Sequence, residues 1–267
     1  MSYDNPQSLF AGTHEHYLRY RVPHPSLFTD LVASLAPPGP ILDLGCGPGS
    51  VALALAERGR QVLAIDANAD MIAAGRAEAA RRGCSSAIDW ICTDVHVLDD
   101  VPQVAAATMA DALHWFDRTE LLTTLDRIVA PGGFLSVIMS FSAGTTKPWW
   151  HPLTERIVDR HLGRARHAGP QATFTASAGG SHETVLRASA FNDLTVMRTD
   201  QRVRMDLDHV LGNQHTQAFS SPPVLGAQRE GFDRDLAVLL LAAEPTGWFE
   251  DTTQPGMIIA RRAPEAS

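Results

Sequence analysis

The hydrophobic and polar positions alternate between two spacings along the chain, and this alternation predicts a sheet with crossover helices. Short apolar runs bounded by glycine, proline or a turn are typical of buried parallel strands. The expected strands are residues 41–44, 61–66, 88–93, 104–109 and 134–139. Helical spacing of apolar residues occurs between them, at 50–58, 71–83 and 118–129. This order indicates a doubly wound α/β sheet with right-handed crossovers.

The regular alternation is absent from the opening residues of the chain and is interrupted again after residue 139. The opening residues mix aromatic, basic and proline positions, and a helical spacing follows at Leu27, Leu31 and Leu35. Glycine, proline and tryptophan replace the alternation from residue 140 to residue 190, which indicates an insertion over the carboxyl edge of the sheet. The segments expected to complete the fold are a strand at 194–205, helices at 206–211 and 234–243, and a strand at 256–261.

These segments divide one decorated domain into four parts. A length of 267 residues fits a single domain with an insertion better than two independent domains. The parts are an N-terminal cap segment and helix (1–36), a core that holds the first five strands (37–140), an insertion that forms a lid over substrate (141–190), and the remainder of the core sheet and its helices (191–267).

The balance of charges disfavours a polyanionic partner. The formal net charge is −8, so the chain as a whole repels phosphate backbones and anionic lipid surfaces. Hydrophobic residues make up 45% of the chain and charged residues 19%, as in ordinary globular proteins. There is no apolar run of about 18 residues, and the start lacks a basic region followed by an apolar one. We therefore expect a cytoplasmic protein that acts on neither nucleic acid nor membrane.

The spacing of cysteines and histidines indicates neither disulfides nor a metal site. The three cysteines, Cys46, Cys84 and Cys92, are odd in number and form no Cys-x-x-Cys pair. His14 and His16 lack further metal ligands at a suitable spacing. We expect reduced thiols and no bound metal.

A glycine-rich turn joins the first predicted strand to the first crossover helix. In Asp43-Leu-Gly-Cys-Gly-Pro-Gly49, glycines alternate with other residues directly before the helix. Such a turn lets a ligand approach the backbone and meet the partial positive charge of a helix N-terminus. The dinucleotide fingerprint Gly-x-Gly-x-x-Gly is not met, because Ser50 stands where its third glycine would be.

An acidic residue ends the second predicted strand. Asp66 follows the glycine turn at about the spacing at which a carboxylate accepts hydrogen bonds from ribose hydroxyls. Two other roles are open, an N-cap for the helix that begins near Met71 and simple solvation of a strand end. The coincidence of turn and spacing favours a nucleoside ligand.

The glycine-rich stretch resembles motif I of the class I S-adenosylmethionine (SAM)-dependent methyltransferases, Asp-x-Gly-x-Gly-x-Gly. The resemblance implies a Rossmann-like, doubly wound and mostly parallel seven-stranded sheet. The lid expected after strand five rests on the composition of the insertion, to which the resemblance does not extend. The resemblance also implies SAM as cofactor and S-adenosyl-L-homocysteine as product. The cofactor-binding residues that it implies are Asp43, Gly45, Cys46, Gly47, Gly49, Asp66, Ala67, Met71, Asp94, Val95 and Ala110. Ala67 and Met71 are equally consistent with core packing, and Asp99 and Asp100 compete with Asp94.

A second stretch narrows the resemblance. Ala110-Asp-Ala-Leu-His-Trp-Phe-Asp117, with Pro131-Gly-Gly133 after it, is similar to the trans-aconitate-methyltransferase-like branch, akin to small-molecule enzymes of the ubiquinone and biotin pathways. Phe10-Ala-Gly-Thr13 and Tyr17-x-x-Tyr20-Arg21 resemble the opening segment of that branch. The chain has Arg21-Val-Pro-His24-Pro25 where Arg-Pro-x-Tyr-Pro is common, which leaves the class of acceptor open.

Methyl transfer from a sulfonium is an in-line displacement, so the enzyme mainly positions the reactants and excludes water. A hydroxyl or amine acceptor also needs a base, whereas a carboxylate needs none. His114 is the first catalytic candidate and Asp111 the second, since both follow the fourth strand. The alternatives are a packing role for His114 and helix capping by Asp111. If His114 is a base, activity should fall below its pKa.

The other candidates for substrate contact are aromatic and basic. An aromatic face favours a sulfonium cation, and an arginine can hold an acidic group. The residues expected to contact substrate are Tyr17, Tyr20, Arg21, His114, Trp115, Trp149 and Trp150. A surface helix would carry the same tyrosines and arginine, and core or dimer packing would equally explain the two tryptophans of the insertion.

We therefore expect a methyltransferase that acts on an oxygen, as hydroxyl or carboxylate, of a metabolite or natural product. Transfer to nitrogen or carbon is open, as is a SAM-binding protein that does not methylate, such as a cyclase or regulatory binder. The Asp/Asn-Pro-Pro-Tyr/Phe motif of amino-methylating DNA enzymes is absent, which adds to the case against nucleic acid. Both a monomer and a homodimer are compatible with the sequence.

Overall fold

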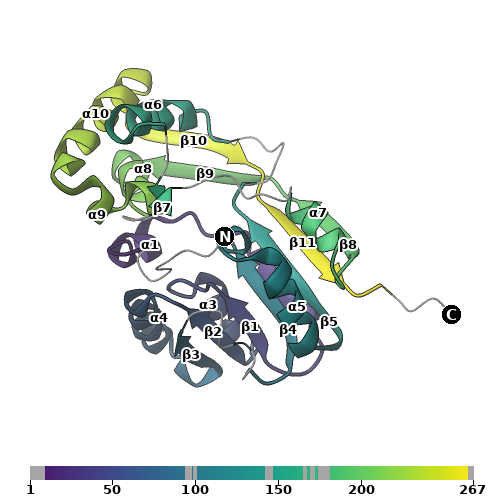
Figure 1. The fold of residues 1–267 in the computed structure, drawn as a ribbon. Coiled ribbons are helices and arrows are strands. Elements are labelled where there is room, and N and C mark those ends of the chain that lie inside the picture. Colours follow the sequence, from purple (N-terminus) through teal and green to yellow (C-terminus); the bar gives the residue numbers. More distant parts are fainter. Residues whose placement is uncertain are drawn as a thin grey trace.

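A seven-stranded sheet forms the centre of the molecule (Figure 1). The computed structural model describes residues 10–93, 98, 101–141, 147–164, 167–168, 172–173 and 181–263. The sheet consists of β3 (Ile88–Cys92), β2 (Val62–Asp66), β1 (Ile41–Leu44), β4 (Val104–Ala110), β5 (Val129–Met139), β11 (Gly256–Arg261) and β8 (Asp193–Arg198), in that spatial order. Strands β1 to β5 are parallel, and β11 runs antiparallel between β5 and β8. The predicted mostly parallel, doubly wound sheet is confirmed.

Helices cover both faces of this sheet because its buried strands are apolar on both sides. Ile41 and Leu42, neighbours in β1, belong to two different hydrophobic clusters. One face carries α2 (Ser26–Leu35), α3 (Ser50–Glu57) and α4 (Ala69–Arg82), and the other carries α5 (Arg118–Ile128) and α7 (His182–Arg187). Short 3₁₀ turns lie at η2 (Ser85–Ala87) and η4 (Leu113–Trp115).

A second unit packs around its own core above the sheet. It contains α6 (His151–Leu162), β9 (Gln201–Asp206), α8 (Leu207–Gln214), η5 (Ala218–Ser220), α9 (Pro222–Leu225), η6 (Gly226–Gln228), α10 (Arg229–Ala243) and β10 (Trp248–Thr253). Strands β9 and β10 pair antiparallel, and Val203, Phe232 and Phe249 are buried between them and the helices. The two-residue strands β6 (His167–Ala168) and β7 (Ala172–Thr173) also pair.

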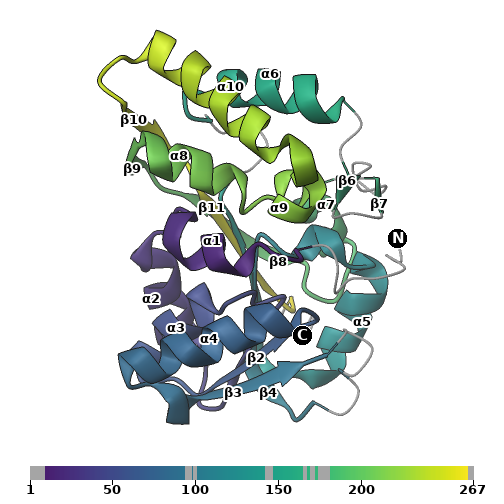
Figure 2. The same cartoon turned by 90° about the vertical axis from the view of Figure 1, so that its left-hand side faces the viewer.

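Helix α1 (His14–Tyr20) lies between the two units, as the two views show (Figures 1 and 2). It packs against α8 of the second unit and against α4 beside the sheet. The strands β1, β2 and β4 end on the side that faces α1. The N-terminal cap expected from the sequence therefore covers the carboxyl edge of the sheet.

The structure divides the last part of the chain differently from the sequence-based expectation. The single strand expected at 194–205 is wrong, because the chain leaves β8 at Thr199 and Asp200 and continues in β9 of the other unit. Residues 191–267 were expected to complete the core sheet. Of the described strands in this segment, β8 and β11 belong to that sheet. The remaining described strands and helices of this segment belong to the second unit. In β9, for example, Val203 and Met205 face the apolar core of that unit.

The expected lid, residues 141–190, is described in part. Its α6 belongs to the second unit, whereas its α7 covers a face of the sheet. Residues 142–146, 165–166, 169–171 and 174–180 lie outside the described part of the chain. A lid therefore stays a prediction.

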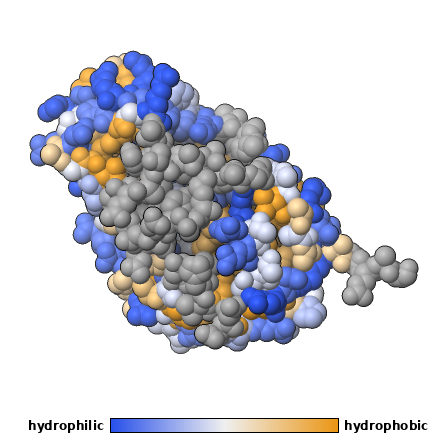
Figure 3. All heavy atoms as spheres, in the orientation of Figure 1, coloured by the Kyte–Doolittle hydropathy of each residue, from blue (hydrophilic) through white to orange (hydrophobic). Residues whose placement is uncertain are grey.

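The face of the second unit that Figure 3 shows is mainly polar. In Figure 3, hydrophilic residues cover most of α6 and α10, and apolar residues form smaller groups. Within the described ranges, none of the helices combines the length and the apolar character needed to cross a bilayer.

Candidate functional site

The three glycines of the loop between β1 and α3 have different roles. Gly45, Gly47 and Gly49 all have positive φ, at 65°, 54° and 82°. A Cβ at Gly45 would lie 2.9 Å from that of Ala112, and one at Gly49 would overlap the ring of Trp90. A Cβ at Gly47 would meet no atom within 4 Å. Two glycines thus permit close packing of the protein on itself, and Gly47 alone presents bare backbone to open space.

Two carboxyl groups lie next to this loop. Asp66, at the end of β2, accepts hydrogen bonds from the backbone N–H of Gly47 at 2.8 Å and of Asn68 at 2.9 Å. Asp43 in β1 is only 1% exposed and accepts a bond from the Ala52 N–H at 3.0 Å. Asp66 therefore fixes the position of Gly47, and Asp43 fixes the start of α3.

Burial raises the pKa of both carboxyl groups. Desolvation raises the pKa of Asp66, against the two backbone hydrogen bonds that lower it. Desolvation also raises the pKa of Asp43, to about 7; the Ala52 N–H opposes this rise and the charge of Asp66 adds to it. A neighbouring cation would stabilise the ionised form of both carboxyl groups.

The cap of α4 excludes one alternative for Asp66. The N-cap is Asn68, whose side chain accepts bonds from the N–H groups of Asp70 and Met71. Asp66 is thus left to hold the loop, and its carboxylate oxygens retain lone pairs for a further donor.

Some of the other expected cofactor residues lie in or near the same loop. Cys46 is within the loop, and burial raises the pKa of its thiol well above the usual range. Ala67 follows β2 and Ala110 ends β4, both partly buried, whereas Met71 is 2% exposed in α4. Two expected residues, Asp94 and Val95, lie outside the described residues.

Asp111 joins the ends of two neighbouring strands to the N-terminal segment. Its carboxylate accepts hydrogen bonds from the N–H and the hydroxyl of Ser140, directly after β5. It also forms an ion pair with Arg21, 2.9 Å from Nη2 to Oδ2, and lies 3.9 Å from Nε2 of His24. Burial favours its neutral form, but Arg21, His24 and Ser140 lower the pKa of Asp111 to about 2. A carboxylate of that pKa is a poor base near neutral pH, so the catalytic role expected for Asp111 is not supported by its chemistry.

The three expected residues of the N-terminal segment separate into two groups. Tyr17 is partly buried, and its pKa is raised by desolvation. The Arg21 guanidinium lies 5.5 Å from the centroid of the Tyr17 ring, so these two residues share the lower side of α1. Tyr20 faces the second unit instead, where its ring covers Gly212 and its hydroxyl donates to Asp208 at 3.0 Å. Tyr20 thus joins α1 to α8 and is removed from the expected substrate contacts.

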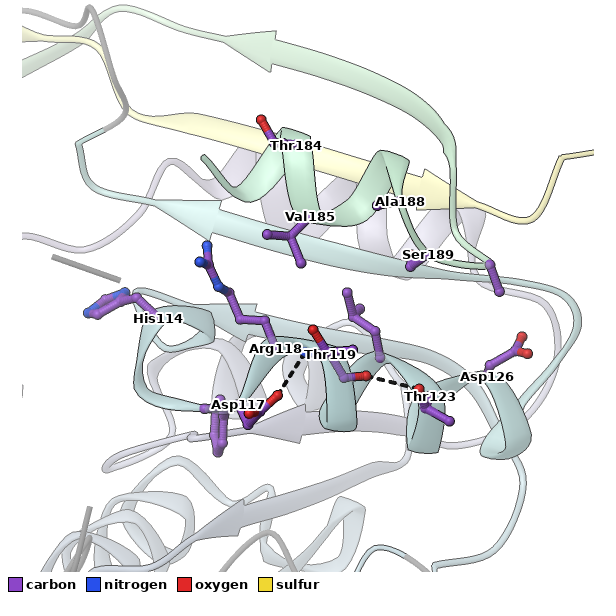
Figure 4. Close-up of a pocket in the computed structure, with 13 residues that line it drawn as sticks. His114, Asp117, Arg118, Thr119, Thr123, Asp126, Thr184, Val185, Ala188 and Ser189 are labelled. Carbon is purple, nitrogen blue, oxygen red and sulfur yellow. Dashed lines mark hydrogen bonds between the residues drawn. The ribbon is translucent and has the colours of Figure 1, made fainter. Parts of the chain in front are cut away.

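His114 lies at one end of a pocket of about 700 Å³ between α5 and α7 (Figure 4). Arg118 and Leu122 of α5 line it opposite Val185 of α7. Desolvation lowers the pKa of His114 to about 4; Asp111 opposes the shift, and nearby His182 and Arg118 add to it. The imidazole is therefore neutral at physiological pH and has a free lone pair for a proton, but its low pKa makes it a weaker base than an ordinary histidine.

His182 is a residue that the sequence reasoning missed. Its ring stacks with that of His114 at 6.2 Å between centroids. No periodic pattern could have indicated it, because it lies in the irregular segment after residue 140. Trp115 packs edge-on against Phe10 at 5.4 Å and forms part of the wall beside His114.

The two tryptophans of the insertion lie in the second unit. Trp150 is 5% exposed in its core, and Trp149 packs near Phe249 and donates its indole N–H to the Glu250 carbonyl. Their described contacts are with α6 and β10, and they do not line the pocket beside His114. Packing thus accounts for Trp150, whereas Trp149 is 41% exposed and its contact with substrate stays a prediction.

Comparison with known proteins agrees with the glycine loop and the sheet. Residues 41–133 match the methyltransferase domain family. The chain is 34% identical over 134 residues to the tRNA 5-carboxymethoxyuridine methyltransferase of Escherichia coli K12, covering 48% of this chain and 50% of that protein. It is 30% identical over 137 residues to an uncharacterized methyltransferase of Mycobacterium tuberculosis, covering 49% and 66%. Residues 41–133 thus form a methyltransferase domain of the class I SAM-dependent type.

A solved structure supports the same fold for the methyltransferase over nearly its whole length. A candidate type II methyltransferase from Anaeromyxobacter dehalogenans superposes with a TM-score of 0.58 at 21% identity, covering 91% of this chain and 98% of that one. The match to the Escherichia coli relative spans about half the length of that protein.

The same relative corrects one expectation about partners. Its name specifies a tRNA substrate, so the exclusion of nucleic acid from the acidic charge of this methyltransferase is not supported. Net charge averages over the whole surface, whereas an acceptor meets one edge of the sheet.

Proposed function

We propose that this chain transfers a methyl group from SAM to an oxygen of a small organic molecule. The observation that carries the proposal is the open space at Gly47, bordered by the carboxyl groups of Asp43 and Asp66. SAM offers a cationic amino-acid portion and ribose hydroxyls, which are the groups that two such carboxyls can bind.

The cofactor residues would act on different parts of SAM. The bare backbone of Gly47 gives the amino-acid portion room, and Asp43 supplies a negative charge nearby. Asp66 accepts from the ribose hydroxyls with the lone pairs that Gly47 and Asn68 leave free. Ala67, Met71 and Ala110 form apolar walls, and we retain Asp94 and Val95 as candidates for the adenine edge.

The acceptor would approach from the side of His114. Tyr17 and Trp115 present aromatic surface at this edge, and the neutral His114 can take the proton of a hydroxyl acceptor as the new oxygen–carbon bond forms. The sulfonium supplies the leaving group, so the protein needs no further chemical group and contributes mainly alignment and exclusion of water. The pocket between α5 and α7 offers space for the part of the acceptor that does not react.

The experiment that tests this function measures cofactor binding and turnover separately. Calorimetry should show that SAM binds. With a metabolite extract as acceptor source, S-adenosyl-L-homocysteine should accumulate and a compound should gain the mass of one methyl group. A parallel assay with total tRNA tests the substrate class of the Escherichia coli relative. Binding of SAM without turnover on either source would favour a protein that does not methylate, and absence of SAM binding would overturn the proposal.

The pKa of Asp43 gives the proposal a pH dependence. Below pH 7 Asp43 takes up a proton, so it no longer attracts a cationic ligand. The affinity for SAM should therefore fall as the pH decreases from 7.5 to 5.5, by roughly tenfold over this range. The upper limit is 7.5 because α-amino groups begin to lose their proton above it. Calorimetric titration at several pH values measures this trend.

Two variants assign the trend to Asp43. Asp43→Asn keeps an oxygen for the Ala52 N–H and removes one titrating charge, so its weaker affinity should vary much less with pH than that of the wild type. Asp89→Asn makes the same change at an exposed position of β3 and should keep the wild-type trend. A wild-type affinity that is level from pH 5.5 to 7.5 contradicts the assignment.

A further inference from the structure

We propose that Asp111 is a positioning residue, whose carboxylate holds Arg21 and with it helix α1 over the carboxyl edge of the sheet. The inference deepens the proposed function, on which it rests, because it assigns a means of ordering the wall that Tyr17 forms beside the cofactor loop. Asp111 acts through Arg21 and α1 and needs no contact with the reacting atoms.

The backbone at Asp111 is held in an unusual conformation. Among the described residues other than glycine, it alone has a positive φ, at 49°. The left-handed conformation is costly for most residues and is tolerated best by Asn and Asp. The N–H of Asp111 donates to the carbonyl of Ile138, and its carboxylate accepts from Ser140. The turn after β4 is thus fixed to the end of β5, and the side chain is aimed at the N-terminal segment.

Arg21 connects this carboxylate to helix α1 and to the second unit. It is the residue that ends the helix, and its N–H donates to the carbonyl of Tyr17, one turn earlier. Its guanidinium pairs with Asp111 through one nitrogen and lies 3.4 Å from the Thr216 hydroxyl of the second unit through another. The Arg21 and Asp111 side chains are only 20% and 18% exposed, so solvent screens their attraction weakly.

The opposite side of α1 is held by different contacts. Tyr20 and Arg19 both reach Asp208 of α8, and the latter pair is more than 60% exposed on each side. Exposed ion pairs contribute little. Loss of the buried charge at Asp111 should therefore release α1 from the sheet and leave its attachment to α8.

The variant Asp111→Asn isolates this charge. Asn tolerates the left-handed backbone and keeps an oxygen for the Ser140 N–H, but it cannot pair with a guanidinium. We expect the affinity for SAM to fall roughly tenfold or more, and amide hydrogen exchange of residues 14–21 to accelerate by a similar factor. Exchange in β1 and β4 should be unchanged. Calorimetry and hydrogen exchange with mass spectrometry measure these quantities.

A matched control makes the same change in a residue that holds the other side of α1. Asp208→Asn removes the exposed pair with Arg19 and should alter neither SAM affinity nor exchange of residues 14–21 by more than about twofold. Acceleration of exchange throughout the sheet in Asp111→Asn would show a general loss of stability and overturn the proposal. So would lost turnover with normal SAM affinity and normal exchange, since that result would make Asp111 a catalytic residue.

A conservative variant provides a readout that a general structural defect would not give. Arg21→Ala should lose SAM affinity and accelerate exchange of residues 14–21 as Asp111→Asn does, because no cation attached to α1 then faces Asp111. Arg21→Lys keeps such a cation and should recover a part of both, but not when it is combined with Asp111→Asn. Unchanged exchange of residues 14–21 in Arg21→Ala, or no recovery in Arg21→Lys, would refute the role of the pair. Exchange is measured without SAM, so a wild type that binds no SAM would refute the proposed function and leave the test of α1 intact.

Discussion

Gly47→Val is expected to weaken SAM binding by on the order of 100-fold. The Cβ and two methyl groups of valine would enter the open space that the cofactor needs, next to Asp43 and Asp66. The backbone φ of 54° adds a conformational cost, which a β-branched side chain meets in full. Equilibrium titration with SAM measures the loss, and thermal unfolding shows whether the fold remains.

Gly83→Val separates the two causes. Gly83 has a φ of 72°, and a Cβ added there would meet no atom within 4 Å, but it ends α4 far along the chain from the loop. It therefore carries the same conformational cost without occupying cofactor space. Its affinity for SAM should match the wild type. Equal affinities in the wild type and in both variants, with the fold intact, would sink the assignment of the cofactor to this loop.

His114→Ala is expected to lower the rate of methyl transfer by roughly 100-fold, with little change in SAM affinity. The substitution removes the neutral imidazole that takes the proton of a hydroxyl acceptor, and Gly47, Asp43 and Asp66 remain in place. His209→Ala removes a half-exposed imidazole from α8 and should leave the rate unchanged. Near-normal turnover in His114→Ala would assign the residue a packing role, as for an acceptor that is already ionised.

The structure changes the pH dependence expected from this residue. A histidine of ordinary pKa would lose its basic form between pH 7 and 6, but burial lowers the pKa of His114 to about 4. Its basic form therefore persists down to about pH 5, and the contribution of His114 should fall only as the pH approaches 4. A level turnover rate from pH 5 to 8, measured at saturating SAM, is consequently expected from an active base. The turnover rate of His114→Ala, and not the pH profile of the wild type, therefore decides whether His114 acts as a base.

The sheet and the cofactor loop could be predicted because their signals are local. A buried parallel strand such as 41–44 is a short apolar run, and the turn after it requires glycine at positive φ. The bounds of β1, β2 and β4 lie within one residue of the predicted ones because these central strands are apolar on both faces, whereas β5 begins at Val129, five residues before the predicted start. The order of strands places Asp66 beside the glycine turn, whereas the expectation for Asp43 and Gly47 came from the resemblance to motif I.

The second unit could not be predicted, because its core combines segments far apart in the chain. Residues of α6, β9 and α10 meet there, and each is locally an ordinary amphipathic or alternating segment. Nothing in the apolar spacing of 194–205 marks the turn at Thr199 and Asp200 where the chain passes from one sheet to another.

The short helix α1 shows a finer limit. Tyr17 and Arg21 are four residues apart and share a side, whereas Tyr20 points to α8. The sequence placed all three in the site because helical spacing says which residues share a face, but not which face meets the sheet. Asp111 was expected after the fourth strand, where it lies, but its ion pair with Arg21 involves a partner 90 residues away that no local pattern indicates.

The position of β11 has a consequence for how the chain acquires its fold during synthesis. This last strand lies between β5 and β8, so those two cannot pair with each other. Until residues 256–261 leave the ribosome, β8 has no neighbour in the sheet and the apolar edge of β5 is bare. The segment from β9 to β10 must be synthesised before β11 can pair and the sheet can close. The completed fold therefore depends on a late contact of long sequence separation, a topology that slows folding and leaves a nascent chain open to edge-to-edge association.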